Sequence, residues 1–264
     1  MTQGLDWAQY RTTEFQGLDP EKVIAILPTA AIEQHGPHLP VGTDTMIAEG
    51  MLAQLRADCP DDLDICICPV QAVGKSNENI HAPGTLTLPA KTVSQAWLNI
   101  GLSIARAGVR KVVIVNSHGG NLDLVSILSR ELRVRAGMLA VKCQRGSFGH
   151  PSGTYPAKEM AFGIHGGDVE TSLMLAFRPE SVDMDHAVDF ASSAEDSLIP
   201  PIGSVSYGWI SSDLNPLGTV GNAAIATADK GRDTCAHQIA GFIELLRNVR
   251  DTPLDGMEPT QPYP

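Results

Sequence analysis

The sequence has little positive charge. Its 264 residues include 19 lysines and arginines against 30 aspartates and glutamates, which gives a formal net charge of −11 at pH 7. The basic residues form no cluster, so the chain lacks the basic face that phosphate binding requires. We therefore expect neither nucleic acid nor an anionic membrane surface as a partner, and we attribute the negative charge to solubility.

Long apolar runs are also missing. No stretch of about 18 apolar residues occurs, so we expect no membrane-spanning helix. The first twenty residues have neither the basic start nor the apolar core of a signal peptide. These absences lead us to expect a cytoplasmic protein.

Cysteine is scarce, with five residues in the chain. The number is odd, and Cys66 and Cys68 have no second pair that would complete a zinc site. We expect buried free thiols in a reducing compartment rather than disulfides.

The composition is sufficient for one large core. Hydrophobic residues make up 43% of the chain and charged residues only 19%, which argues against disorder. The length suits one α/β domain, which we assign to residues 1–250. The proline-rich segment 251–264 is expected to be a frayed tail or an arm laid on a neighbouring subunit.

Four short apolar runs predict strands that are buried on both faces, because they are continuous rather than alternating. They are Val23–Leu27, Ile65–Val70, Val112–Val115 and Met138–Val141. The segments with helical spacing are Thr45–Arg56, Thr92–Ala107, Leu122–Arg135, Asp168–Ala176 and Ala223–Val249, the last with a break near Gly231. The alternation predicts βαβ units and an α/β fold with a mostly parallel sheet. We expect loops, with room for a hairpin, over residues 179–222.

Ligands of parallel sheets bind beyond the carboxyl ends of the strands, and "AAIEQHGPHLPVGTDT" follows the first strand. Glu33 and His35 share one side of an extended segment, and Asp44 lies at the expected start of a helix. Two carboxylates and an imidazole suit Zn²⁺, Mn²⁺, Fe²⁺ or Co²⁺ better than Ca²⁺ or Mg²⁺. The alternative is that Glu33 is a solvated loop residue and that Asp44 or Thr45 only caps the helix.

A second motif, "NSHGGN", follows another predicted strand. Its His118 is a candidate metal ligand, and Gly119, Gly120 and Asn121 lead into a helix. Free N–H groups at a helix start can hold an oxyanion or a substrate carbonyl. The alternative is a histidine satisfied at a strand end.

Two further segments carry polar residues. In "HGGDVETSLML", His165 lies on a glycine loop, and Glu170 is either a ligand or an acceptor that orients a histidine; it could also only stabilise the helix start. In "GKSNENIHAPGTLTLP", Glu78 and His81 are candidate substrate contacts, although the segment could equally be a polar surface loop.

Together these segments resemble the signature segments of the creatininase (creatinine amidohydrolase) family. The resemblance runs in order from about residue 23 to about residue 177, with a weaker echo at "GTVGNAAIATADKG" near Gly218. It implies a three-layer α/β/α sandwich, a two-metal hydrolase site, and assembly as a homo-oligomer, often a hexamer.

The resemblance also implies roles for individual residues. Glu33 and His118 would bind one metal ion, His35 would bind the other, and Asp44 would bridge both. The remaining two roles are proton transfer by His165 and a place for Glu170 as a ligand of the second metal or beside it.

The chain departs from creatininase itself at two places. Gly120 stands where creatininase has a glutamate ligand, two residues after the metal-binding histidine. The residues before His165, "YPAKEMAFGI", lack the tryptophans that line the creatinine pocket. The resemblance is therefore to the family rather than to creatininase.

We expect a hydrolase in which a hydroxide shared by two divalent ions attacks the carbonyl of a small, cyclic, non-peptide amide. The ions would be zinc or manganese, with iron as a third choice. The amides of Gly119 and Gly120 would hold the oxyanion, and His165 would protonate the leaving nitrogen. Formamides, peptides and cyclic polyol ketones of the 3-dehydro-inosose type are alternative substrates. A mononuclear metallopeptidase is disfavoured because no H-E-x-x-H occurs, and a non-catalytic metal-binding protein is the alternative from another class.

Overall fold

The computed structural model describes residues 6–260. Its centre is a sheet of four parallel strands in the order β2–β1–β3–β4. The strands are β1 (Ile24–Thr29), β2 (Ile65–Ile67), β3 (Lys111–Asn116) and β4 (Leu139–Gln144). Every residue of β1 is buried, because this strand has neighbours on both edges and helices on both faces. The predicted parallel sheet is confirmed, although β2 ends earlier than expected, just before Pro69, which cannot donate to the ladder.

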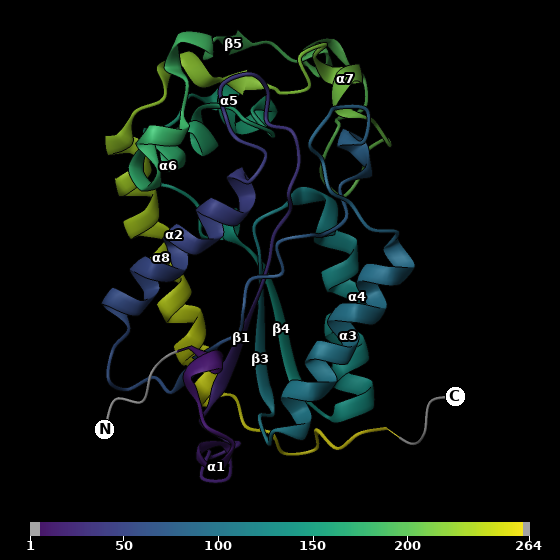
Figure 1. Ribbon diagram of the computed structural model, residues 1–264, viewed down its shortest axis with the longest axis vertical. Helices are drawn as coiled ribbons and strands as arrows, with labels where there is room; N and C mark the ends of the chain where they lie inside the picture. Colours follow the sequence, from purple (N-terminus) through teal and green to yellow (C-terminus); the bar gives the residue numbers. More distant parts are fainter. Residues whose placement is uncertain (1–5, 261–264) are drawn as a thin grey trace.

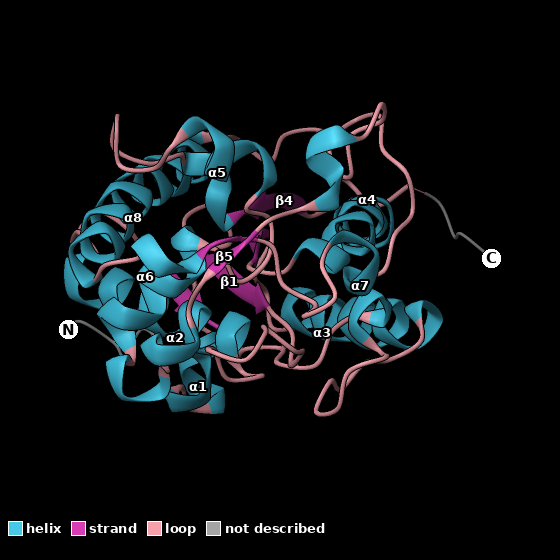
Figure 2. Cartoon of the chain, turned by 90° about the horizontal axis from the view of Figure 1, so that it is seen from above, coloured by secondary structure: helices cyan, strands magenta, loops and turns pink. Residues whose placement is uncertain are grey.

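Helices cover both faces of the sheet (Figure 1), and the view from above shows the sheet between the two helical groups (Figure 2). One group is α2 (Thr43–Asp58), α6 (Asp168–Phe177) and α8 (Ala228–Asp251), and the other is α3 (Ala90–Arg106) and α4 (Leu122–Ala136). Successive residues of β1 point to opposite faces: Ile24 and Ile26 join the core of the first group, and Ala25 and Leu27 join that of the second. The expected three-layer α/β/α sandwich is therefore present.

Short elements complete the chain. They are α1 (Thr12–Phe15), α5 (Ala157–Phe162), α7 (Ser211–Leu214), β5 (Asp189–Phe190) and β6 (Gly221–Asn222). α5, α7 and β5 lie at the end of the molecule farthest from α1 (Figure 1). β5 and β6 pair antiparallel, but α7 lies between them in the chain, so they are not the hairpin that the sequence allowed.

α2 begins two residues earlier than the sequence predicted, after Gly42, and no side chain caps it. Asp44 therefore lies inside the first turn rather than at the N-cap. The Thr45 hydroxyl donates instead to the Ala31 carbonyl, at 3.0 Å. The Asp44 carboxylate is consequently not used as a cap.

α8 continues through Gly231, so the predicted break is wrong. Gly231 is buried where α8 crosses α6. A β-carbon at this position would overlap the backbone carbonyl of Ser172 and would come within 3.0 Å of Ala176 Cβ. The glycine permits close packing of two helices instead of ending one.

The segment after α8 lies against its own chain. The Arg110 guanidinium donates to the Met257 carbonyl at 2.9 Å, and Arg133 donates to the Gly256 and Glu258 carbonyls. The Thr260 amide donates to the Val134 carbonyl at 3.1 Å. Up to Thr260 the segment is thus held by hydrogen bonds to its own chain rather than frayed, and residues 261–264 lie outside the described part.

The five cysteines, all within the described residues, are free thiols. Burial raises the pKa of Cys68 and Cys143 to about 12 and that of Cys235 to about 11, which makes these thiols unreactive near neutral pH. No helix within residues 6–260 combines the length and the apolarity that crossing a membrane would require.

We predict that Gly231→Ala destabilises the protein, although glycine-to-alanine changes in helix interiors are usually stabilising by about 0.5–1 kcal/mol. The added methyl group must push α8 away from Ser172, and overpacking of this kind costs about 1–3 kcal/mol. Urea unfolding measures the difference. Asp233→Ala, on the exposed side of the same helix, is the control and should change stability little; a Gly231→Ala variant at least as stable as the wild type would contradict this packing.

Candidate metal centre

Side chains from five segments converge beyond the carboxyl ends of β1 and β3. The segments are the loop after β1, the first turn of α2, the 3₁₀ turn at 77–79, the end of β3 and the start of α6. The converging side chains are Glu33, His35, Asp44, Glu78, His118, His165 and Glu170. Three of these side chains keep between 11% and 17% exposure, namely Glu78, His165 and Glu170, so the cluster meets solvent on their side.

His118 faces two carboxylates with one ring nitrogen. Its Nδ1 lies 3.1 Å from Glu33 Oε1 and 3.2 Å from Asp44 Oδ2. His118 follows β3 directly, and the loop that carries Glu33 follows β1, which is the neighbouring strand. The pairing of the two strands therefore brings these side chains together.

His35 faces the other oxygen of the same aspartate. Its Nε2 lies 3.8 Å from Asp44 Oδ1 and 3.6 Å from Glu170 Oε2. His35 Nδ1 lies 3.0 Å from the Glu33 carbonyl, which can only accept, so Nδ1 carries a hydrogen and Nε2 is the nitrogen that presents a lone pair once the ring is neutral. Asp44 thus stands between two histidines, with one carboxylate oxygen toward each.

Two atoms of this arrangement are buried without a hydrogen-bond partner among the described residues. They are His35 Nε2 and Asp44 Oδ2. A buried polar atom without a partner costs roughly 1–3 kcal/mol. Lone pairs of an imidazole and a carboxylate that face a shared space are the donors that divalent transition-metal ions accept, so this cluster fits a metal.

The carboxylates and imidazoles of the cluster shift one another's pKa values. Burial opposes protonation of His118, but the Glu33 and Asp44 carboxylates outweigh it and raise the pKa of His118 well above its ordinary value. Burial likewise raises the pKa of Asp44, and the nearby histidines offset this only in part. In the absence of a cation, protons on His35 and His118, whose pKa values are both raised by the carboxylates, therefore balance the negative charge.

Glu33 is fixed by the loop that follows β2. Its Oε2 accepts hydrogen bonds from the Ser76 hydroxyl and, at 2.7 Å, from the Asn79 amide. Both donors are buried. Glu33 Oε1 is left to face His118 and, at 3.5 Å, His165 Nδ1. Oε2 thus anchors the Glu33 side chain, and Oε1 faces the two histidines.

The His165 loop is held by the segment that contains the echo near Gly218. The Thr219 hydroxyl donates to the His165 carbonyl at 2.6 Å. Gly36 and Gly166 both have positive φ angles, and a β-carbon on either would collide with Thr219. These two glycines let the loops that carry His35 and His165 approach one threonine. The centroids of the His35 and His165 rings then lie 4.3 Å apart.

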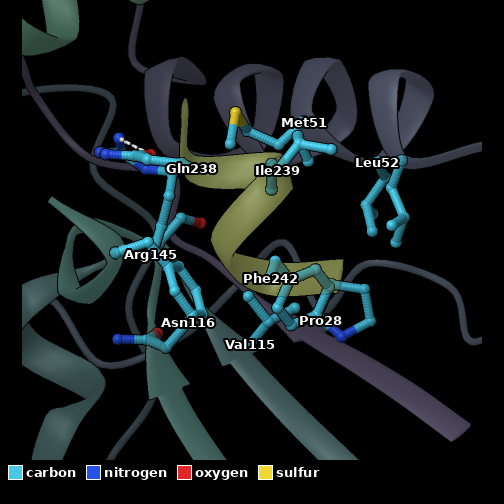
Figure 3. A pocket seen from close by; sticks show the side chains of 13 residues that line it. Pro28, Met51, Leu52, Val115, Asn116, Arg145, Gln238, Ile239 and Phe242 are labelled. Atoms are coloured by element: carbon cyan, nitrogen blue, oxygen red, sulfur yellow. Dashed lines mark hydrogen bonds between the residues drawn. The ribbon is translucent and has the colours of Figure 1, made fainter. Parts of the chain in front are cut away.

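Arg145 connects the cluster to a cavity beneath it. The cavity has a volume of about 40 Å³ and lies between α2, α8 and the sheet, with mainly apolar walls that include Met51, Ile239 and Phe242 (Figure 3). Arg145 Nη2 lies 4.0 Å from Glu170 Oε1. Burial opposes ionisation of Glu170, but His35, His165 and Arg145 together lower its pKa.

Some predicted substrate contacts lie differently. His81 is exposed and lies outside the cluster. Asn121 is completely buried, and its amide group binds the Ala30 carbonyl, Asn116 Oδ1 and the Lys75 amide. The side chain of Asn121 is therefore used in tying three segments together, and its role as a substrate contact stays a prediction. Gly119 is the more open of the two glycines, because a β-carbon added there would have no atom of residues 6–260 within 4 Å.

The sequence did not point to several residues that support the cluster. They are His38, Ser76, Asn79, Arg145 and Thr219. His38 is buried, and its Nε2 lies 2.9 Å from the Thr171 hydroxyl, while its ring stacks on Phe190 at 5.2 Å between centroids. His38 lies in "HGPH", Ser76 and Asn79 lie in "GKSNENIHAPGTLTLP", and Thr219 lies in the echo near Gly218, whereas Arg145 has no local signal.

Comparisons with known proteins identify the family. The family model "Creatininase: Creatinine amidohydrolase" matches residues 8–246. The mycofactocin precursor peptide peptidase of Mycolicibacterium smegmatis is 27% identical over 85% of this chain and 84% of its own length. The creatinine amidohydrolase of Pseudomonas putida is 29% identical over 90% of this chain and 94% of its own.

Solved structures of creatininase share the fold. A manganese form has a TM-score of 0.70 and 22% identity, and it covers 94% of this chain and 100% of its own. A variant described as Zn–Zn type has a TM-score of 0.69 and 22% identity, with 95% and 100% covered. The α/β sandwich found here is thus the architecture of those proteins.

The buried His38 predicts a pH dependence of stability. Burial lowers its pKa from 6.5 to about 4, so between these values the unfolded chain binds a proton at this position that the folded protein does not. Stability must then fall as the pH drops from about 6.5 toward 4. Urea unfolding of chelator-treated protein should show a shallower loss over this range for His38→Asn than for the wild type, and equal slopes would refute the assignment.

Proposed function

The chain belongs to the creatininase family of hydrolases, and we propose that it hydrolyses an amide C–N bond with the help of two divalent metal ions. The observation that carries this proposal is the position of Asp44. Its two oxygens face two different histidines, at 3.2 Å and 3.8 Å. A carboxylate in this position can serve two cations at once.

Two sets of donors would hold the ions. Glu33 and His118 would hold one ion together with Asp44 Oδ2, and His35 and Glu170 would hold the other together with Asp44 Oδ1. The distances within each set support this division. Carboxylate and imidazole donors accept zinc, manganese or iron. Creatininase, which shares the fold, has been solved in manganese and Zn–Zn forms.

Ions bound there would polarise a substrate carbonyl and lower the pKa of water toward neutrality. Neighbouring residues of the chain would hold the metal-binding side chains in the required orientation. Glu33 is held through Ser76 and Asn79 by one oxygen, so its other oxygen stays directed at the site. His35 presents its Nε2 lone pair inward, because its Nδ1 is engaged by a carbonyl.

His165 is the proposed proton carrier. Its Nε2 lies 2.7 Å from the Gln34 carbonyl, which can only accept, so Nε2 carries the hydrogen. Nδ1 then has a free lone pair on the cluster side and can take a proton and return it to the leaving nitrogen. Because Glu33 Oε1 lies 3.5 Å away, the protonated ring would be stabilised during the transfer.

For the substrate, we propose a small cyclic amide, as the sequence suggested. A short peptide is a second candidate, since four of the curated relatives, 27–29% identical to this chain, are named as peptide peptidases. Both substrates contain the same bond, so the proposed chemistry is common to them. Cyclic polyol ketones are also tested, because one relative, 24% identical to this chain, is named 3-dehydro-scyllo-inosose hydrolase.

Metal-loaded protein should hydrolyse at least one amide in a panel of cyclic amides, short peptides, formamides and cyclic polyol ketones, and turnover of a ketone alone would contradict cleavage of an amide C–N bond. Activity should disappear with EDTA and return with zinc or manganese. Turnover is measured by mass spectrometry of the products. A protein that takes up two ions and hydrolyses none of these compounds would instead be a metal-binding protein, and turnover that survives complete metal removal would also refute the proposal.

His35→Ala should bind one metal equivalent fewer than the wild type and should lose turnover, because His35 is the imidazole that faces both Glu170 and Asp44 Oδ1. Elemental analysis of the dialysed protein counts the ions. His186→Ala, at an exposed position, is the control and should keep both metal and activity. Full metal content in His35→Ala would contradict the assignment.

His165→Ala should keep its metal and lose about 10²–10⁴-fold in kcat, which is the usual contribution of a general acid–base group. The KM should change much less, since the proton carrier acts in the chemical step. Metal content and steady-state kinetics are measured on the same sample. An unchanged kcat would remove His165 from the mechanism.

A further inference from the structure

The space beside Gly120 is already filled by another residue. A β-carbon at position 120 would overlap Glu78 Oε1 and the Lys75 carbonyl oxygen, and it would lie 2.6 Å from His118 Nε2. At the adjacent Gly119, by contrast, no atom of the described residues lies within 4 Å of such a carbon. Glycine is thus needed at 120 because of Glu78 and its neighbours.

Glu78 contacts the ring nitrogen of His118 that faces away from the other carboxylates. His118 Nε2 lies 2.9 Å from the Lys75 carbonyl and 3.3 Å from Glu78 Oε1. A carbonyl oxygen only accepts hydrogen bonds, so Nε2 carries a hydrogen. Nδ1, on the side of Glu33 and Asp44, is then the atom with a lone pair once the ring is neutral.

The segment that delivers Glu78 is anchored on both sides. Ser76 and Asn79 donate to Glu33, and the Lys75 amide donates to Asn121 Oδ1 at 2.9 Å. The Ser211 hydroxyl donates to the Glu78 carbonyl at 3.4 Å. The backbone of Glu78 is therefore held by residues from three other parts of the chain, and its carboxylate reaches His118 from a fixed position.

We propose that Glu78 is the positioning residue for His118 and that Gly120 is the glycine that admits it. This inference rests on the proposed metal site. A carboxylate from the 74–89 loop fills the space that a side chain at position 120 would otherwise occupy. Beside the Lys75 carbonyl, the Glu78 carboxylate acts on the metal through the imidazole: its negative charge stabilises the hydrogen on Nε2 and keeps the lone pair of Nδ1 directed inward. Removal of such partners weakens metal binding about 10–100-fold.

The test is a zinc titration of chelator-treated protein by calorimetry. Glu78→Ala should weaken binding by about 10–100-fold without changing the number of ions bound, and Glu78→Gln, whose amide oxygen still accepts, should lose less. Gly120→Ala should weaken binding because the methyl group displaces Glu78. Gly119→Ala, one residue earlier, should keep the wild-type affinity. Thermal unfolding of each variant confirms that it is folded.

A second readout requires no metal. The imidazole Nε2–H of His118 should give a slowly exchanging signal in ¹⁵N-edited NMR of the wild type and a rapidly exchanging one in Glu78→Ala. Wild-type zinc affinity together with an unchanged Nε2–H signal in Glu78→Ala would overturn the inference. If the wild type bound no zinc, the proposed function would fail, while the NMR comparison would still decide whether Glu78 positions His118.

Discussion

The structure depends on the burial of four carboxylates and three imidazoles in one small region. Such groups leave water only if hydrogen bonds or opposite charges replace their hydration. Here one oxygen of Glu33 is fully engaged by Ser76 and Asn79, yet His35 Nε2 and Asp44 Oδ2 remain without a hydrogen-bond partner within the described residues. A cation between these groups would satisfy them, and this requirement links the fold to the proposed chemistry.

The fold meets this requirement through the carboxyl ends of two neighbouring strands. β1 and β3 pair in register from Ile24 and Lys111 onward, so the loops that leave them begin side by side. Hydrogen bonds then fix each loop: Asn121 connects the end of β1 to the 74–76 segment, and Thr219 holds the His165 loop. Most of the polar residues around the cluster therefore support its geometry without facing it.

Much of this arrangement could be predicted from the sequence. The apolar runs indicated the sheet and its parallel order, because a continuous buried strand has a clear local pattern. Glu33, His35, Asp44 and His118 could be named because each lies within or just beyond a motif that follows a strand. The start of α2, which faces the site, was harder to predict, because Asp44 was expected at the N-cap and the helix in fact begins at Thr43.

The features that could not be predicted from the sequence depend on contacts between distant segments. Gly231 looked like a helix break, but the carbonyl of Ser172 explains it. The structural role of Asn121 was not visible in the sequence either, because its partners lie at residues 30, 75 and 116. No local pattern could have shown that Glu78 occupies the space beside Gly120, because the loop that carries Glu78 precedes Gly120 by about forty residues.

The most direct test of the central claim is anomalous X-ray diffraction from crystals grown with zinc or manganese. The account predicts two separate anomalous peaks among Glu33, His35, His118 and Glu170, with Asp44 in contact with both. A single peak, or Glu33, His35 and His118 directed to separate places with no ion between them, would contradict it.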